Sequence, residues 1–196
     1  MPTLKAKNRA PRQDNRRAAL LDAAATRFAG QGFHATSTRE LAAAVGMLPG
    51  SIYYHFPSKS DLLVAVYDEG VKRIETAVTQ AIADLDEPWA RLEAACTAHL
   101  ETLLDGSAYA HVVVRVQPGD DERADAALVV MRDRYESLFR DLVSALGLAD
   151  IQAERSLRLL LLGALNWVPH WYRPGRDTPG TIVHRFMGLL AQGKPL

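Results

Sequence analysis

The sequence predicts an all-α protein with about nine helices, and three observations support this. Apolar residues recur at helical spacing in most segments, as Leu20, Leu21, Ala24 and Phe28 do. Residues typical of helix starts and stops, such as Ser, Thr, Pro and Gly, separate these segments. Strand-like alternation is nearly absent, because the one β-branched run, at residues 111–116, is too isolated to form a sheet.

Length and composition are those of a soluble globular protein. The chain has 196 residues, of which 48% are apolar and 23% charged. The single cysteine, Cys96, excludes a disulfide framework and a cysteine-rich zinc site. The longest uncharged stretch near the C-terminus, residues 159–172, is 14 residues long, whereas a membrane span needs roughly 20. With no apolar segment after the basic N-terminal residues, we expect no secretory signal, no membrane contact and a cytoplasmic location.

A zero net charge hides an uneven distribution along the chain. Residues 1–60 carry nine Lys or Arg and three Asp or Glu, whereas residues 61–196 carry 14 and 20. A basic end on a neutral chain suits contact with a polyanion. A basic disordered tail would give the same imbalance, since four of the nine basic residues precede Asp14.

The N-terminal segments are interpreted as an arm, a helix and a compact helical pair. Residues 1–13 are basic and interrupted by proline, which predicts a mobile arm. A helix is expected over residues 14–29, with Gly30 and Gly32 ending it.

The compact pair has clear start and stop signals. Ser37 and Glu40 have the spacing of a capping box, which starts a helix that Gly46 ends. A second short helix is expected at residues 49–55, ended by the Phe56-Pro57 pair. Together with the preceding helix this is a helix-turn-helix, whose second helix fits the major groove of DNA. Residues 14–60 are therefore predicted to be a DNA-binding domain, with Ile52 and Phe56 facing its core.

The remaining residues, 61–196, are predicted to form a second helical domain. Ser58 and Asp61 start a long helix that reaches about residue 84. Further helices are expected over residues 88–106, 107–116, 121–146, 149–172 and 179–192.

Residues 27–63 carry a longer signature, RFAGQGFHATSTRELAAAVGMLPGSIYYHFPSKSDLL. This stretch resembles the TetR family of one-component transcriptional regulators. The resemblance covers about residues 14–70 and implies a ligand-responsive repressor of a palindromic double-stranded DNA operator. It also implies that the C-terminal domain binds a small effector and forms a homodimer. By position, it places the DNA contacts at Ser37, Thr38, Arg39, Pro49, Gly50, Ser51, Tyr53, Tyr54, His55 and Lys59.

One departure from the family pattern concerns the start of the recognition helix. Pro49 and Gly50 offer few side-chain atoms there. Specificity is therefore expected to depend on Arg39, on Tyr54 and on DNA shape. Lys59 is expected to bind a phosphate, because it lies in the first turn of the next helix.

The last two helices are predicted to form the dimer interface. The leucine-rich segment at residues 157–165 is apolar around most of the helix, so it requires burial on several sides. An ordinary monomer core is the alternative explanation. The resemblance to the TetR family implies a four-helix dimer interface from these two helices, and the residues assigned to it are Leu157, Leu161, Leu165, Ile182, Phe186 and Leu190.

The effector site is expected among the middle helices of the second domain. Apolar character and the family layout suggest a pocket lined by Leu100, Leu103, Tyr109, Val113, Met131 and Trp167. The segment ALNWVPHWYRPGRDTPGTI at residues 164–182 looks like a TetR subgroup that senses acyl-coenzyme A thioesters. Such a thioester would need cations, for which Arg115 and Arg173 are candidates. Alternatively, Trp167 and Trp171 seal the dimer core and Arg173 caps a helix.

Other functions have weaker support. The motifs GxSxG, GxGxxG and the phosphate-binding loop are absent, so no enzyme activity and no cofactor are expected. The six histidines show no metal-ligand spacing, and Cys96 is expected to be a buried, inert thiol. The alternative function is a dimeric DNA-binding protein without ligand control, for which ligand screening would find nothing.

Overall fold

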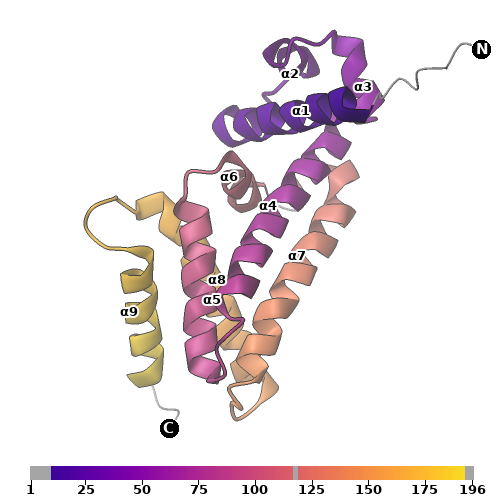
Figure 1. Cartoon of the computed structure of the whole chain (residues 1–196). Coiled ribbons are helices and arrows are strands. Elements are labelled where there is room, and N and C mark those ends of the chain that lie inside the picture. Colours follow the sequence, from indigo (N-terminus) through magenta and orange to yellow (C-terminus); the bar gives the residue numbers. More distant parts are fainter. Residues whose placement is uncertain (1–9, 117–118, 193–196) are drawn as a thin grey trace, which may run out of the picture.

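A computed structural model describes residues 10–116 and 119–192, and all regular elements there are helices (Figure 1). The described part contains nine α-helices and one short 3-10 helix, which confirms the all-α prediction. The first helix, α1 (Ala10–Gln31), begins four residues before the predicted start at residue 14. Pro11 fits there because the first turn of a helix needs no backbone N–H donor. Residues 10–13 are therefore helical, and the rest of the predicted arm lies outside the described residues.

The N-terminal unit packs three short elements against α1. These are α2 (Thr38–Ala44), the 3-10 helix η1 (Pro49–Ser51) and α3 (Ile52–His55), and in Figure 1 α2 and α3 lie on the same side of α1. Phe28, Leu41 and Ile52 are fully buried between them. A short α3 is thus held by its buried face, because so few residues would not form a stable helix alone.

A long helix, α4 (Lys59–Ala81), connects this unit to the rest of the protein (Figure 1). It begins at the Ser58 cap, whose hydroxyl accepts the Asp61 N–H at 3.0 Å. The predicted division between residues 60 and 61 falls inside the first turn of α4, so both units share one continuous helix.

The C-terminal helices form a bundle around α4. They are α5 (Pro88–Leu104), α6 (Ala108–Arg115), α7 (Glu122–Ser144), α8 (Ile151–Trp171) and α9 (Pro179–Gln192). Helix α4 contacts α5, α6 and α7, while α5 also contacts α8 and α9. The short α6 lies between α1 and the bundle, in contact with both α1 and α4 (Figure 1). Among the described helices, none is long and apolar enough to span a membrane.

Helices α4 and α6 approach each other closely at Gly70. A Cβ atom there would lie 2.6 Å from Val113 Cγ2 and 2.8 Å from the Tyr109 carbonyl oxygen. Since real Cβ atoms do not come so near other atoms, only glycine allows this spacing.

The apolar residues that α8 and α9 expose are not those predicted for the dimer interface. Leu161, Leu165 and Ile182 are buried within the chain itself, and Leu157, Phe186 and Leu190 are partly buried against the same core. The bundle of the single chain therefore covers Leu161, Leu165 and Ile182, and it covers the other three in part. The apolar side chains left exposed are Leu159, Leu160, Trp167, Trp171 and Leu189. The surface of α8 and α9 that remains open to a partner therefore includes these five side chains.

Candidate nucleic-acid interface and effector cavity

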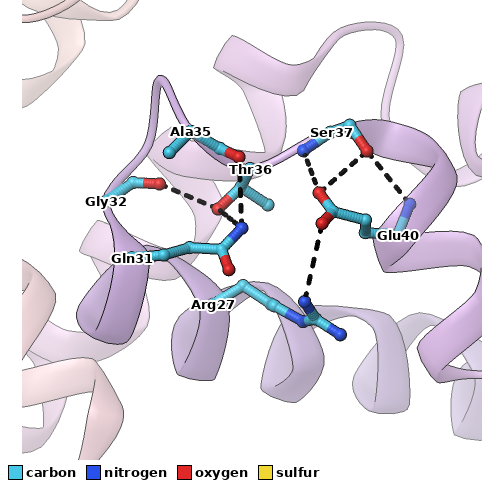
Figure 2. Close-up of polar contacts among 7 residues, drawn as sticks. All are labelled: Arg27, Gln31, Gly32, Ala35, Thr36, Ser37 and Glu40. Carbon is cyan, nitrogen blue, oxygen red and sulfur yellow. Dashed lines mark hydrogen bonds and ion pairs between the residues drawn. The ribbon is translucent and has the colours of Figure 1, made fainter.

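The turn between α1 and α2 is fixed by a network of polar contacts (Figure 2). Ser37 Oγ accepts the Glu40 N–H at 3.2 Å, and Glu40 Oε2 accepts the Ser37 N–H at 2.8 Å. This is the capping box that the sequence predicts. The Ser37 backbone N–H holds the pKa of the Glu40 carboxyl below its usual value. Arg27 of α1 lies 3.8 Å from Glu40, so α1 also orients α2.

The loop before α2 is closed by Thr36. Its buried hydroxyl donates to the Gly32 carbonyl oxygen at 2.8 Å, while the Gln31 amide donates to the Ala35 carbonyl oxygen at 3.1 Å (Figure 2). These short-range bonds set the angle at which α2 leaves α1.

Helix α3 presents its polar side to solvent. Ile52 and Phe56 are 0% and 4% exposed, as predicted for core residues. Tyr53 and Tyr54 are 53% and 73% exposed, so their rings extend from the surface. Exposed tyrosines on a short braced helix can reach base edges and phosphate oxygens.

The other residues assigned to DNA contact differ in availability. Arg39, Pro49 and Gly50 are exposed, whereas Thr38, Ser51 and His55 are half-buried. Ser37 is exposed, but its hydroxyl already bonds Glu40.

A small hollow of about 360 Å³ lies beside the recognition helix. Ser51, Tyr54 and His55 line it together with Arg16 of α1 and Met47. The sequence motif does not single out Arg16, because it lies outside the matching stretch. Its basic charge near the N-terminus is the only signal for it.

Lys59 has a structural role in addition to its predicted one. Its ammonium donates to the carbonyl oxygens of Phe33 and Thr36 at 2.9 and 3.0 Å. It also lies 4.2 Å from the centre of the Phe33 ring. Two of its three N–H donors are therefore used to hold the loop before α2.

Helix α6 is hydrogen-bonded to α1 near both of its ends. Tyr109 Oη donates to Asp22 Oδ1 at 2.6 Å. Burial and the Asp22 carboxylate raise the pKa of Tyr109, so the phenol stays protonated. At the other end, Arg115 Nη1 donates to the carbonyl oxygens of Ala29 and Gly30 at 2.7 and 3.2 Å. A cation at these carbonyls also suits the negative end of the α1 dipole.

A cavity of about 720 Å³ lies between α4, α6, α7 and α8. Of the residues predicted to line it, Val113 and Trp167 do so. Leu100 and Leu103 are instead fully buried in the core, Tyr109 bonds Asp22, and Met131 packs against the core. Periodicity identified these four as apolar, but it does not show which apolar face meets a void.

The cavity wall includes charged and polar side chains that the pattern did not indicate. Glu136 pairs with Arg158 of α8 and lies 3.8 Å from Arg132. His99, Tyr135 and Asn166 form a hydrogen-bonded group on the same wall. A histidine within an apolar helical stretch is the sequence signal that could have indicated this group.

Arg115 lines the cavity, whereas Arg173 does not and donates to the carbonyl oxygen of Tyr172 at 3.0 Å. Cys96 is fully buried, and burial raises the pKa of its thiol to about 12. The thiol is therefore protonated and unreactive at neutral pH. Within the described ranges there is no group of three or more metal-ligating side chains.

A helix-turn-helix joined to a helical bundle with a cavity between its helices defines a class of one-component regulators. Residues 20–66 match the family model described as bacterial regulatory proteins, tetR family. Residues 85–194 match the model described as tetracyclin repressor-like, C-terminal domain. The chain belongs to the TetR family of bacterial transcriptional regulators, which confirms the resemblance; the members of this family are DNA-binding regulators and not enzymes.

Individual relatives agree with this assignment. The HTH-type transcriptional repressor KstR2 of Rhodococcus jostii is 30% identical over 92% of each chain. The HTH-type transcriptional activator FasR of Mycolicibacterium smegmatis is 37% identical over 48% of this chain and 42% of its own. The structure of AibR in complex with isovaleryl coenzyme A and operator DNA has a TM-score of 0.77 at 24% identity, covering 89% of this chain and 97% of AibR. That likeness concerns the fold.

Proposed function

We propose that this protein is a homodimeric repressor whose hold on a palindromic operator is released by a small effector. One observation carries the proposal: α6 both lines the cavity and is hydrogen-bonded to α1 of the DNA-binding unit. A molecule that prefers a different position of α6 would therefore also move α1. Such a molecule shifts the population between two states by its difference in affinity for them.

DNA recognition is assigned to α3 and to the start of α2. Tyr53 and Tyr54 face solvent on α3, and Arg39 is exposed on α2. Two copies related by a twofold axis would place two α3 helices in successive major grooves, which requires a palindromic site. The role of repressor is supported by KstR2, a repressor by name, which aligns with nearly the whole chain.

The assembly is assigned to the exposed apolar surface of α8 and α9. Leu159, Leu160 and Leu189 are 49%, 58% and 69% exposed, and together with Trp167 and Trp171 they leave apolar area in contact with water. Covering this surface with a second copy supplies the hydrophobic contribution that holds a dimer together.

The effector is expected to be apolar or amphipathic. A volume of about 720 Å³ falls within the range of cavities that enclose drug-sized ligands. An acyl-coenzyme A is one candidate, with its acyl chain inside and its phosphates at an opening. Arg115 gives the acyl-coenzyme A candidate only weak support as a phosphate-binding cation, because its guanidinium already donates to two α1 carbonyl oxygens.

The DNA-binding part is tested with duplexes that the protein itself selects from a random-sequence pool. Tyr54→Ala should change the selected sequence, because the exposed ring is assigned to base contact. Trp89→Ala, which removes an exposed ring far away on α5, should leave the selected sequence unchanged. An unchanged sequence with Tyr54→Ala would show that α3 does not read bases through this ring.

The effector part is tested by thermal shift and by release of the selected duplex. The panel contains acyl-coenzyme A esters of several chain lengths and apolar compounds without coenzyme A. Release by an apolar compound but by no thioester would exclude the thioester version. Release by no compound would favour a dimeric DNA-binding protein without ligand control.

A further inference from the structure

Three helices of the cavity wall contribute one hydrogen-bonded chain of side chains. His99 of α5 lies between Tyr135 of α7 and Asn166 of α8. His99 Nδ1 is 2.6 Å from Tyr135 Oη, and His99 Nε2 is 3.1 Å from Asn166 Oδ1. All three residues line the cavity.

The donors and acceptors of these two hydrogen bonds follow from the neutral state of the imidazole and from the amide oxygen that it contacts. His99 is 2% exposed, and desolvation lowers the pKa of its imidazole to about 4, so the ring is neutral and carries one N–H. Because an amide oxygen only accepts, Nε2 holds the hydrogen and donates to Asn166. Nδ1 then accepts the hydroxyl hydrogen of Tyr135. The Tyr135 ring lies nearly parallel to the imidazole, with an angle of 17° between their planes, so the phenol and imidazole are well packed.

In this arrangement the oxygen of the Asn166 amide accepts a hydrogen bond, while the amide nitrogen makes no hydrogen bond to a described residue. Among the described residues, none accepts a hydrogen bond from the two N–H groups of that amide. Among the other polar groups of the wall, Glu136 pairs with Arg158 and Arg115 binds α1 carbonyls, whereas Arg132 Nε is buried without a hydrogen-bond partner in the described part of the chain, 3.8 Å from Glu136. Most of the remaining wall is apolar, with Val71, Ile74 and Leu162 among its side chains. A ligand that covers the amide with hydrocarbon would therefore leave its N–H donors without a partner, which is costly.

We propose that the Asn166 amide donates a hydrogen bond to an uncharged carbonyl oxygen of the effector, with His99 and Tyr135 fixing the amide's orientation. The inference rests on the proposed effector site and specifies its ligand class. A ketone and the acyl group of a thioester both carry such an oxygen. His99 and Tyr135 act as positioning residues, since they reach the ligand through Asn166.

The experiment compares probes that differ only in the carbonyl group. One pair is 2-decanone and decane, and the other is decanoyl-coenzyme A and its thioether analogue S-decyl-coenzyme A. Affinities are measured by calorimetry and thermal shift with the full-length protein and with two variants. Asn166→Asp keeps an oxygen for His99 but has no N–H, and Asn166→Leu removes both polar atoms. Gln152→Glu, an amide-to-carboxylate change at an exposed position of α8, is the matched control.

In both Asn166 variants the affinity for a carbonyl probe should fall by about tenfold, the equivalent of one hydrogen bond. The affinity for its carbonyl-free partner should change by less than about threefold. Gln152→Glu should change neither. If only 2-decanone loses affinity in the Asn166 variants, the effector's carbonyl is assigned to a ketone. If only decanoyl-coenzyme A loses affinity, it is assigned to a thioester. Equal weakening of both members of a pair, or no carbonyl preference in the unmodified protein, overturns the inference. The proposed effector control is judged separately, by release of DNA with the wider panel.

Discussion

At the scale of single residues, two cations that a DNA-binding protein could use on phosphates are partly committed to its own backbone. Lys59 and Arg115 each donate to two carbonyl oxygens, Lys59 beside α2 and Arg115 at the end of α1. These two side chains therefore stabilise the geometry of the DNA-binding unit, and they also make its electrostatic potential more positive. A residue that matches a binding motif can hold the motif in shape.

Lys59→Met should lower the free energy of unfolding by about 1–3 kcal/mol, because two carbonyls lose a charged partner. Urea denaturation measures this change. Lys72→Met is the control, since Lys72 forms only an exposed ion pair with Asp68 and should change stability by less than about 0.5 kcal/mol. Salt titration of DNA binding tests the phosphate contact independently: losing one contact should lower the log–log slope by about 0.9. A stability loss with an unchanged slope would assign Lys59 a purely structural role.

His99 predicts a pH dependence of stability. Its pKa is about 4 in the folded protein and about 6.5 when exposed, so the unfolded chain binds more protons between these values. Stability should therefore fall as pH decreases from about 6.5 to 4, by up to roughly 3 kcal/mol from this residue. Thermal unfolding at several pH values measures the effect. His99→Gln should flatten the profile in this window; an equally steep profile in the variant would assign the loss to carboxylates.

At the scale of elements, α6 is a second connection between the two parts of the molecule, in addition to the continuous helix α4. It packs on α4 at Gly70, bonds α1 through Tyr109 and Arg115, and supplies part of the cavity wall. With only eight residues, it depends on these contacts for its position. We therefore expect a change in the α4–α6 spacing to reach α1.

Gly70→Ala tests that spacing. The added methyl group would overlap Val113 and the Tyr109 carbonyl, which we expect to cost about 1–3 kcal/mol of stability and to displace α6. Operator affinity should fall without any effector. Gly30→Ala is the matched control in α1, because no atom lies within 4 Å of its added Cβ. Urea denaturation and DNA titration of both variants measure the outcome. Unchanged DNA binding in Gly70→Ala would show that the position of α6 does not affect α1.

At the scale of the whole molecule, we assign the assembly to the apolar surface of α8 and α9 that the single chain leaves exposed. Leu161 and Leu165, two of the leucines predicted for the interface, are buried within one chain, so substituting Leu161 would test folding and not association. The appropriate positions are those that remain exposed.

Leu160→Asp should convert the dimer to monomers, because a carboxylate in an apolar interface costs several kcal/mol. The monomers should remain folded, since Leu160 is 58% exposed in the single chain. Light scattering gives the mass and circular dichroism the helix content. Val130→Asp, at a 68% exposed position of α7, should leave the mass unchanged. A stable dimer with Leu160→Asp would place the interface elsewhere.

The sequence by itself determined the helices and the helix-turn-helix, because caps, glycine stops and apolar periodicity act over a few residues. The Ser37–Glu40 capping box and the burial of Ile52 and Phe56 were confirmed for this reason. Only the tertiary structure decided which face of an apolar helix meets its own bundle, a cavity or solvent. That choice depends on helices far apart in the chain, as in the meeting of His99, Tyr135 and Asn166 from α5, α7 and α8. Leucine-rich α8 is apolar on both faces, so periodicity could not distinguish its core from its exposed surface.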